Sequence, residues 1–151
     1  MKLAIGSDHA GFELKKNLIS YLKEKGHEIV DYGTYSLDSC DYPDFAKGVA
    51  EDVVNHKVDF GIVICYTGIG ISIAANKYKG VRCALVRSSD EVILTREHND
   101  ANILALGAKY TPLAYAKELV ELFINTPFSK MEKHQRRIDK IKEIERWVLL
   151  F

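Results

Sequence analysis

Short apolar runs alternate with amphipathic stretches along most of the chain. The runs have the length of strands, and they lie at residues 2–7, 27–31, 60–65, 81–86 and 103–106. The run at 60–65, FGIVIC, is rich in β-branched residues and apolar at successive positions. A strand that is apolar on both faces belongs in the middle of a parallel sheet, where helices cover both sides. The pattern therefore predicts five strands with FGIVIC near the centre of the sheet.

Helical spacing fills the segments between the strands. In residues 11–25, Leu14, Leu18 and Leu22 recur on one face with lysines on the other, and Gly26 follows where a helix commonly ends. The same spacing predicts helices that follow Pro43 and that occupy residues 71–76, 89–97 and 112–124. Since strand and helix alternate five times, we expect one domain, residues 1–151, with a parallel sheet between two layers of helices.

A last amphipathic helix is predicted at about residues 130–151. It contains no glycine or proline, and Ile141, Ile144, Val148 and Phe151 form an apolar stripe along it. Because the five strand–helix units are already complete, this helix has little of its own domain left to cover. We therefore expect it to pack on a partner subunit. The alternative is that it lies over an edge of its own sheet.

Composition and charge narrow the function classes. The chain has 151 residues, 47% of them hydrophobic, which fits one soluble globular domain. Lys+Arg and Asp+Glu both number 21, and a net charge of zero argues against binding long nucleic acid or an anionic membrane through bulk charge. The longest uncharged stretch, residues 60–76, is too short to span a bilayer, and the N-terminus lacks the apolar core of a signal peptide.

The three cysteines indicate a reducing location. They are odd in number and widely spaced, and no C-x-x-C motif occurs. We therefore expect neither a disulfide framework nor a zinc cluster, and a cytoplasmic protein. The five histidines include no pair at i, i+4, so no metal site is expected.

Candidate chemistry gathers at the predicted strand ends. In open parallel sheets, ligands bind outside the carboxyl ends of the strands. The first strand is followed there by Asp8 and His9, and the third by Cys65 and Thr67. His98 comes at the end of the fourth helix, just before the fifth strand. His9 and His98 are each candidates for acid–base chemistry near neutral pH, with a structural role as the alternative.

Cys65 stands at the start of a tight glycine turn that leads into a helix. The first N–H groups of a helix carry positive partial charge, so a thiol there can have a pKa below the ordinary value of about 8.5. The same N–H groups can hold a developing oxyanion. The alternative is an inert small hydrophobic residue, which is also what we expect of Cys40 and Cys83.

The glycine turn matches no standard nucleotide-binding loop. Gly68 and Gly70 are not followed by a third glycine at the spacing of dinucleotide-binding proteins, and no phosphate-binding G-x-x-x-x-G-K-[ST] loop occurs. A cysteine phosphatase would need an arginine where Ile71 stands. These three classes are therefore disfavoured.

A basic cluster near the C-terminus could bind a small phosphate. Lys133, Arg136 and Arg137 flank His134, and Lys109 after the fifth strand could join them. The alternative is a solvated helical face. An RNA-binding role is disfavoured because no aromatic stacking platform accompanies the basic residues.

Five segments of the chain together resemble one family. They are SDHAGFELK, GTYS followed by DYPDFA, CYTGIGISIAANK, REHNDANILALGAK and HQRRIDKI. Over residues 2–145 the chain resembles the B-type ribose-5-phosphate isomerases, in the family that includes the galactose-6-phosphate isomerase subunits. The resemblance implies a Rossmann-like α/β/α fold and a homodimeric core with active sites between subunits. It also implies interconversion of an aldose phosphate and a ketose phosphate without metal or cofactor.

The resemblance assigns roles residue by residue. Cys65 matches the base that moves a proton between C1 and C2, Thr67 the hydroxyl beside it, and His98 the acid that opens the sugar ring. Asn99 matches a neighbouring ligand of the sugar. The backbone cradle for the enediolate matches Tyr66, Thr67, Gly68, Ile69 and Gly70. Some relatives carry a carboxylate base where this chain has Ile71, so the chain is of the cysteine type.

The remaining assignments concern binding. Asp8 and His9 match ligands of the sugar and of its phosphate end, and Lys109, Lys133 and Arg137 match basic phosphate ligands. Lys109 and Lys133 replace the commoner arginine, which removes a bidentate fork. Tyr66 stands where the family usually has glycine, so a positive φ there would be strained.

The leading hypothesis is therefore isomerisation of D-ribose 5-phosphate and D-ribulose 5-phosphate. Alternatives are an isomerase of allose or galactose 6-phosphate and a non-catalytic sugar-phosphate-binding protein. The sequence leaves a homodimer and a homotetramer open, and it predicts no nucleic-acid or membrane partner.

Overall fold

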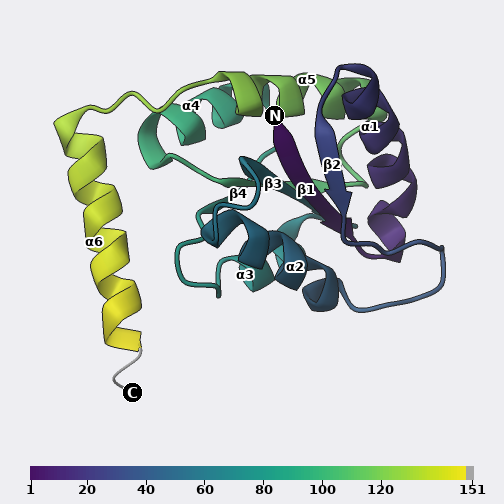
Figure 1. Ribbon diagram of the computed structural model, residues 1–151, viewed down its shortest axis with the longest axis horizontal. Coiled ribbons are helices and arrows are strands. Elements are labelled where there is room, and N and C mark those ends of the chain that lie inside the picture. The colour runs from purple at the N-terminus through teal and green to yellow at the C-terminus, as the bar shows by residue number, and fades with distance from the viewer. Residues whose placement is uncertain (149–151) are drawn as a thin grey trace.

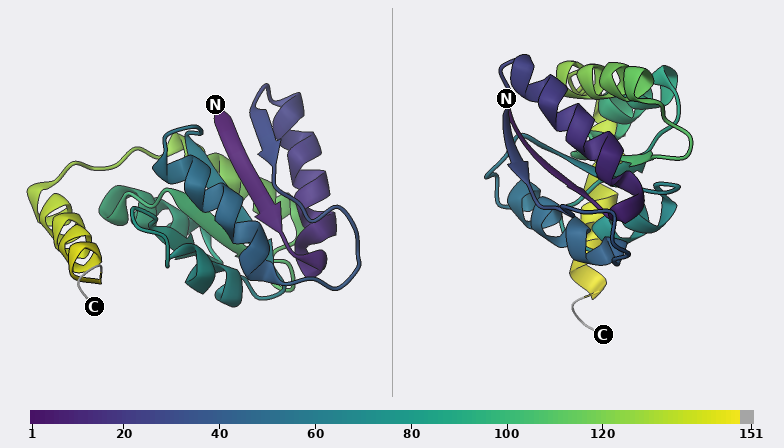
Figure 2. Two further views of the ribbon diagram at one scale, coloured as in Figure 1. Left: turned by 60° about the horizontal axis from the view of Figure 1, so that its bottom comes forward. Right: turned by 90° about the vertical axis from the view of Figure 1, so that its right-hand side faces the viewer.

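Five parallel strands form one sheet between two layers of helices (Figures 1 and 2). The structure is a computed structural model that describes residues 1–148. The strands, in the order β2-β1-β3-β5-β4, are β1 (Lys2–Ser7), β2 (Glu28–Asp31), β3 (Phe60–Cys65), β4 (Cys83–Leu85) and β5 (Ile103–Gly107). The predicted three-layer α/β/α fold is confirmed.

The helices divide between the two faces of the sheet. One face carries α1 (Phe12–Glu24), α4 (Ser89–Asn99) and α5 (Leu113–Asn125), and the other carries α2 (Tyr42–Val54) and α3 (Ile69–Ala75) (Figure 1). A short 3-10 helix, η1 (His9–Gly11), links β1 to α1. Burial follows the period of the central strand: Ile62 and Ile64 belong to one core, and Val63 and Cys65 to the other.

Two of the differences from the predicted bounds have identifiable reasons. β4 is shorter than 81–86 because it is an edge strand, and its outer side is paired by a side chain. Asn76 donates from Nδ2 to the Cys83 carbonyl and accepts from the Cys83 amide, both at 2.9 Å. α3 begins at Ile69, two residues early, because Gly68 turns the chain through φ 78° directly after Thr67.

The final helix, α6 (Glu132–Val148), stands beside the domain after an extended link (Figure 1). His134 and Ile138 are buried against the domain, and the Glu145 carboxylate accepts from the Gly80 amide at 2.9 Å. Further along, Ile144 and Trp147 remain 63% and 62% exposed. Packing of this helix on a partner subunit stays a prediction, and residues 149–151, with the Phe151 end of the predicted stripe, lie outside the described residues.

A buried arginine joins α4 to α5 at the amino edge of the sheet. The Arg96 guanidinium donates to the Asp100 carboxylate at 2.8 Å, to the Ala101 carbonyl at 2.7 Å and to the Thr126 carbonyl at 3.0 Å. Its Cζ lies 4.9 Å from the centroid of the Phe60 ring. These bonds fix the turn between α4 and β5, and therefore the end of α4 that carries His98.

Replacing Arg96 by Met should destabilise the fold. The substitution leaves buried carbonyls without donors, so we expect the free energy of unfolding to fall by about 3 kcal/mol. Urea titration at fixed protein concentration measures the change. Arg136→Met is the matched control, because Arg136 is exposed and, among the residues that the structure describes, pairs only with Glu132 on its own helix. It should cost under about 0.5 kcal/mol. Equal losses in both variants would contradict this role of Arg96.

Candidate active site

The carboxyl ends of β1 and β3 lie side by side at the point where the strand order changes direction. β2 extends the sheet on the far side of β1, and β5 and β4 extend it beyond β3. Ser7 pairs with Ile64 at the ends of these two strands. The helices that follow β1 and β3 leave on opposite faces (Figure 2, right). A crevice at such a switch point is the usual ligand site of an open α/β sheet.

Asp8 shapes the turn after β1. Its Oδ1 accepts from the amides of Ala10 at 3.0 Å and Gly11 at 3.1 Å, and the residue is only 6% exposed. The carboxylate therefore caps η1 and holds His9 at the carboxyl edge of the sheet. The His9 Nδ1 accepts from the backbone amide of Cys40 at 3.2 Å.

Cys65 ends β3 with its sulfur against the glycine turn. The Gly68 amide donates to Cys65 Sγ at 3.2 Å, and the Ile69 amide donates to Thr67 Oγ1 at 3.2 Å. Two amides of the expected cradle thus already hold the two candidate side chains. Cys65 is 4% exposed. Its sulfur therefore sits in a water-poor place with a backbone dipole aimed at it.

Only glycine fits at the centre of this turn. Gly68 has φ 78°, and a Cβ there would lie 2.6 Å from Leu85 Cδ1 and 2.9 Å from the Gly107 nitrogen. A Cβ on Gly70 would meet the Tyr42 ring at 2.6 Å. The turn therefore packs closely against the end of β5.

Tyr66 and Lys109 lie next to one another on the rim. The Lys109 amide donates to the Tyr66 carbonyl at 2.9 Å, and the Lys109 ammonium lies 5.5 Å from the centroid of the Tyr66 ring. Tyr66 is 54% exposed. Its backbone φ is not positive, so Tyr66 does not carry the strain that a positive φ would impose on a residue other than glycine.

His98 and Asn99 lie at the opposite edge of the sheet from Cys65. Cys65 pairs with Gly107, the last residue of β5, whereas His98 and Asn99 end α4 just before the first residue of β5, Ile103. The length of β5 alone separates the two edges by about 13 Å. Within one chain, His98 and Cys65 therefore cannot act on the same sugar carbon.

The predicted site residues thus form two groups. We call the first the carboxyl-edge group: Asp8, His9, Cys65, Tyr66, Thr67, Gly68, Ile69, Gly70 and Lys109. The second, with α6 beside it, is the amino-edge group: the predicted His98, Asn99, Lys133 and Arg137, together with His134, which was not among the predicted site residues. The structure brings the members of each group together and keeps the two groups apart within the chain.

The amino-edge group is organised around two stacked histidines. The rings of His98 and His134 lie 4.2 Å apart at 15°, which joins α4 to α6. Burial lowers the pKa of His134 below its ordinary value, and the charges of His98, Lys133 and Arg137 lower it further. Both effects favour the neutral ring of His134, and a neutral ring spares the stack two adjacent positive charges.

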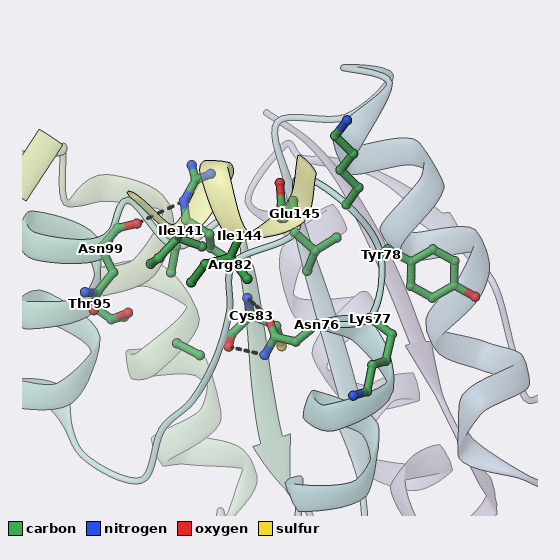
Figure 3. Close-up of a pocket in the computed structure, with 14 residues that line it drawn as sticks. Asn76, Lys77, Tyr78, Arg82, Cys83, Thr95, Asn99, Ile141, Ile144 and Glu145 are labelled. Carbon is green, nitrogen blue, oxygen red and sulfur yellow. Dashed lines mark hydrogen bonds between the residues drawn. The ribbon is translucent and has the colours of Figure 1, made fainter. Parts of the chain in front are cut away.

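A cleft of about 710 Å³ separates α6 from the start of β4 (Figure 3). Ile141 and Ile144 of α6 line one side, and Arg82, Cys83 and Asn99 lie across from them. Cys65 does not line this cleft. The apolar inner face of α6 is therefore only partly covered by its own chain, at the edge where the amino-edge group lies.

The other titratable groups of the described chain offer little chemistry. Burial raises the pKa of Cys83 to about 12, so its thiol stays protonated. Within residues 1–148, no three side chains among His, Cys, Asp and Glu gather as a metal site would require. The described helices include none long and apolar enough to cross a bilayer.

Sequence reasoning missed two contacts that support the site. The basic run predicts no separate role for His134, although its position between Lys133 and Arg137 on one helical turn is a usable signal. The Cys40 thiol is expected to be inert, but the Cys40 amide bonds His9 across 31 positions of the chain. Contacts at that separation have no signature in local pattern.

Comparisons with known proteins identify the family of the chain. The family model described as Ribose/Galactose Isomerase matches residues 3–141. Ribose-5-phosphate isomerase B of Escherichia coli is 42% identical over 144 residues, which cover 95% of this chain and 96% of that protein.

Solved structures match over nearly the whole chain. Ribose-5-phosphate isomerase B of Clostridium thermocellum superposes with a TM-score of 0.95 at 47% identity, covering 98% of this chain and 99% of the other. The enzyme of Mycoplasma genitalium with bound ribulose-5-phosphate superposes with a TM-score of 0.90 at 43% identity, covering 96% of each. By its sequence and its fold, the chain belongs to the ribose/galactose isomerase family.

Proposed function

We propose that this chain interconverts D-ribose 5-phosphate and D-ribulose 5-phosphate through an enediolate. The observation that carries the proposal is the Cys65–Gly70 turn at the switch point, where a thiol, a hydroxyl and backbone amides lie within one bend. Its support from outside the chain is the similarity to ribose-5-phosphate isomerases B, including one that holds ribulose-5-phosphate.

The proposed reaction moves one proton between adjacent carbons. Cys65, as the thiolate, takes the proton from C2 of the open-chain aldose, and the C–H electron pair becomes a C1–C2 double bond while the C1 carbonyl oxygen becomes negative. A proton then passes from the C2 hydroxyl to that oxygen. Cys65 returns its proton to C1, and the C2 carbonyl of the ketose forms. Thr67 and the turn amides hold the transient negative oxygen.

Ring opening requires His98, and His98 must come from a second copy. Ribose 5-phosphate is mostly cyclic, so an acid has to protonate the ring oxygen before Cys65 can act. Because His98 lies at the opposite edge of its own sheet, the amino-edge group of one subunit completes the carboxyl-edge group of another. In a two-fold dimer this pairing makes two identical sites.

The phosphate end of the substrate meets basic residues from both groups. His9 and Lys109 come from the carboxyl-edge group, and Lys133 and Arg137 are exposed on α6. Asp8 and Asn99 bind sugar hydroxyls. The partly uncovered inner face of α6 is the dimer contact in this proposal, with Ile141 and Ile144 at its centre.

The proposed location is the cytoplasm. All three cysteines are free thiols in this structure, and a thiolate base needs a compartment that keeps it reduced. The proposed chemistry uses no metal and no cofactor, since an enediolate can be held by hydrogen-bond donors alone.

Replacing Cys65 by Ala should abolish turnover while leaving substrate bound. Loss of a general base costs about 10²- to 10⁴-fold in kcat, and the binding groups remain in place. A coupled assay with chelator present measures kcat for ribose 5-phosphate, and calorimetry measures binding. Cys83→Ala, which removes the thiol of a residue that pairs with the first residue of β5 and not the last, is the matched control and should stay active.

Three results would count against this account. They are an active Cys65→Ala variant, wild-type activity that chelation removes, and a purified protein that binds sugar phosphate without turning it over. The same assay on allose 6-phosphate and galactose 6-phosphate ranks the substrates by kcat/KM, and ribose 5-phosphate should rank first.

Mixing two inactive variants should restore activity if sites form between subunits. Cys65→Ala and His98→Gln are each inactive alone, but a mixed dimer holds one site with both residues intact. After complete subunit exchange, half of the dimers are mixed, so about a quarter of wild-type activity should return. If both residues acted within one chain, every mixed dimer would be dead and no activity would appear.

A further inference from the structure

The loop between β2 and α2 reaches across to His9. Its last part brings Cys40 against the imidazole: the Cys40 amide donates to His9 Nδ1 at 3.2 Å, and the thiol sulfur lies 3.9 Å from the same nitrogen. The backbone N–H can only donate, so Nδ1 must accept with its lone pair. In the neutral ring the proton is then on Nε2.

This loop is tied down at its start by a buried ion pair. Lys15 of α1 is 1% exposed, and its ammonium lies 2.6 Å from Asp31 Oδ1 at the end of β2. The same carboxylate oxygen accepts from the Gly33 amide at 2.9 Å, and the Tyr35 hydroxyl donates to the Asp31 carbonyl at 2.8 Å. The buried lysine therefore orders the segment that leads towards Cys40.

The loop also continues the pairing of β1 past the end of β2. The Ser7 amide donates to the Gly33 carbonyl and the Thr34 amide donates to the Ser7 carbonyl, each at 2.6 Å. His9 follows Ser7 by two residues. The end of β1 therefore positions both His9 and the start of the loop. This keeps the Cys40 amide aligned with the His9 ring.

We propose that Cys40 is a positioning residue whose backbone amide fixes His9 in the Nε2–H tautomer, so that the ring donates a hydrogen bond to an oxygen of the sugar phosphate. The inference rests on the proposed function and deepens it. Phosphate oxygens at neutral pH are mainly acceptors. A ring with its lone pair on Nε2 would repel them, whereas the fixed tautomer meets them with a proton.

The positioning role belongs to the Cys40 amide and not to its thiol. Two variants can therefore separate the contributions of these two groups. Cys40→Pro removes the N–H, and Cys40→Ala removes the thiol but keeps the N–H. Cys40→Pro should raise KM for ribose 5-phosphate by roughly five-fold, the size of one hydrogen bond, with kcat within about two-fold. Cys40→Ala should leave KM near the wild-type value. An equal rise in KM in both variants, or no rise in Cys40→Pro, overturns the proposal.

A second measurement reads the tautomer directly and does not depend on activity. Nitrogen NMR of the ring at about pH 8.5, well above the ordinary pKa of free imidazole, distinguishes Nδ1 from Nε2 protonation. His9→Gln assigns the signal. Wild type and Cys40→Ala should show Nε2–H alone, and folded Cys40→Pro, checked by circular dichroism, should show a mixture of tautomers.

The two measurements separate the failure of this proposal from failure of the proposed function. Nδ1 protonation of His9 in the wild-type protein overturns the positioning role even if Cys40→Pro does not fold. A protein that turns over no ribose 5-phosphate yet shows the fixed tautomer contradicts the proposed function, and with it the sugar phosphate as the acceptor of the Nε2 proton.

Discussion

A parallel sheet sends the carboxyl end of every strand to one edge, and this separates the two halves of the chemistry. Cys65 ends β3 at that edge, while His98 ends a helix that runs back to the opposite edge. No side-chain movement closes a gap set by the length of β5. In the proposed mechanism each chain therefore holds only part of the site, and a two-fold partner is the simplest assembly that completes the site of both copies.

The packing of the glycine turn positions the hydrogen-bond donor of Cys65. Gly68 and Gly107 lie so close that a Cβ on either would meet the backbone of the other segment, at 2.9 Å and 2.4 Å respectively. That contact folds the chain back on itself and aims the Gly68 amide at the Cys65 sulfur. Packing and chemistry therefore depend on the same residues. A residue larger than glycine at position 68 or 107 would open the turn, and the Gly68 amide would then move away from the Cys65 sulfur.

Local pattern predicted the strands and the layers because the three inner strands, β1, β3 and β5, bury both of their faces. It gave wrong bounds for β4, where Asn76 replaces a neighbouring strand, and for the start of α3, where one left-handed glycine moves the helix boundary. The sequence is sufficient to predict the separation of His98 from Cys65, because a helix that leads into a parallel strand must end at the amino edge of the sheet. Local pattern cannot predict the stacking of His98 on His134 or the Lys15–Asp31 ion pair, because each contact joins segments that are distant in sequence.

The central claim is that Cys65 and His98 at one substrate site come from different subunits. A crystal structure with ribulose 5-phosphate bound tests this directly. We predict the Cys65 sulfur of one subunit within about 4 Å of C1 and C2, the distance needed for proton transfer, with His98 of the partner subunit at the O4 hydroxyl that closes the ring. A sugar held by His98 and Cys65 of the same chain, or one that lies away from the Cys65 turn, would contradict it.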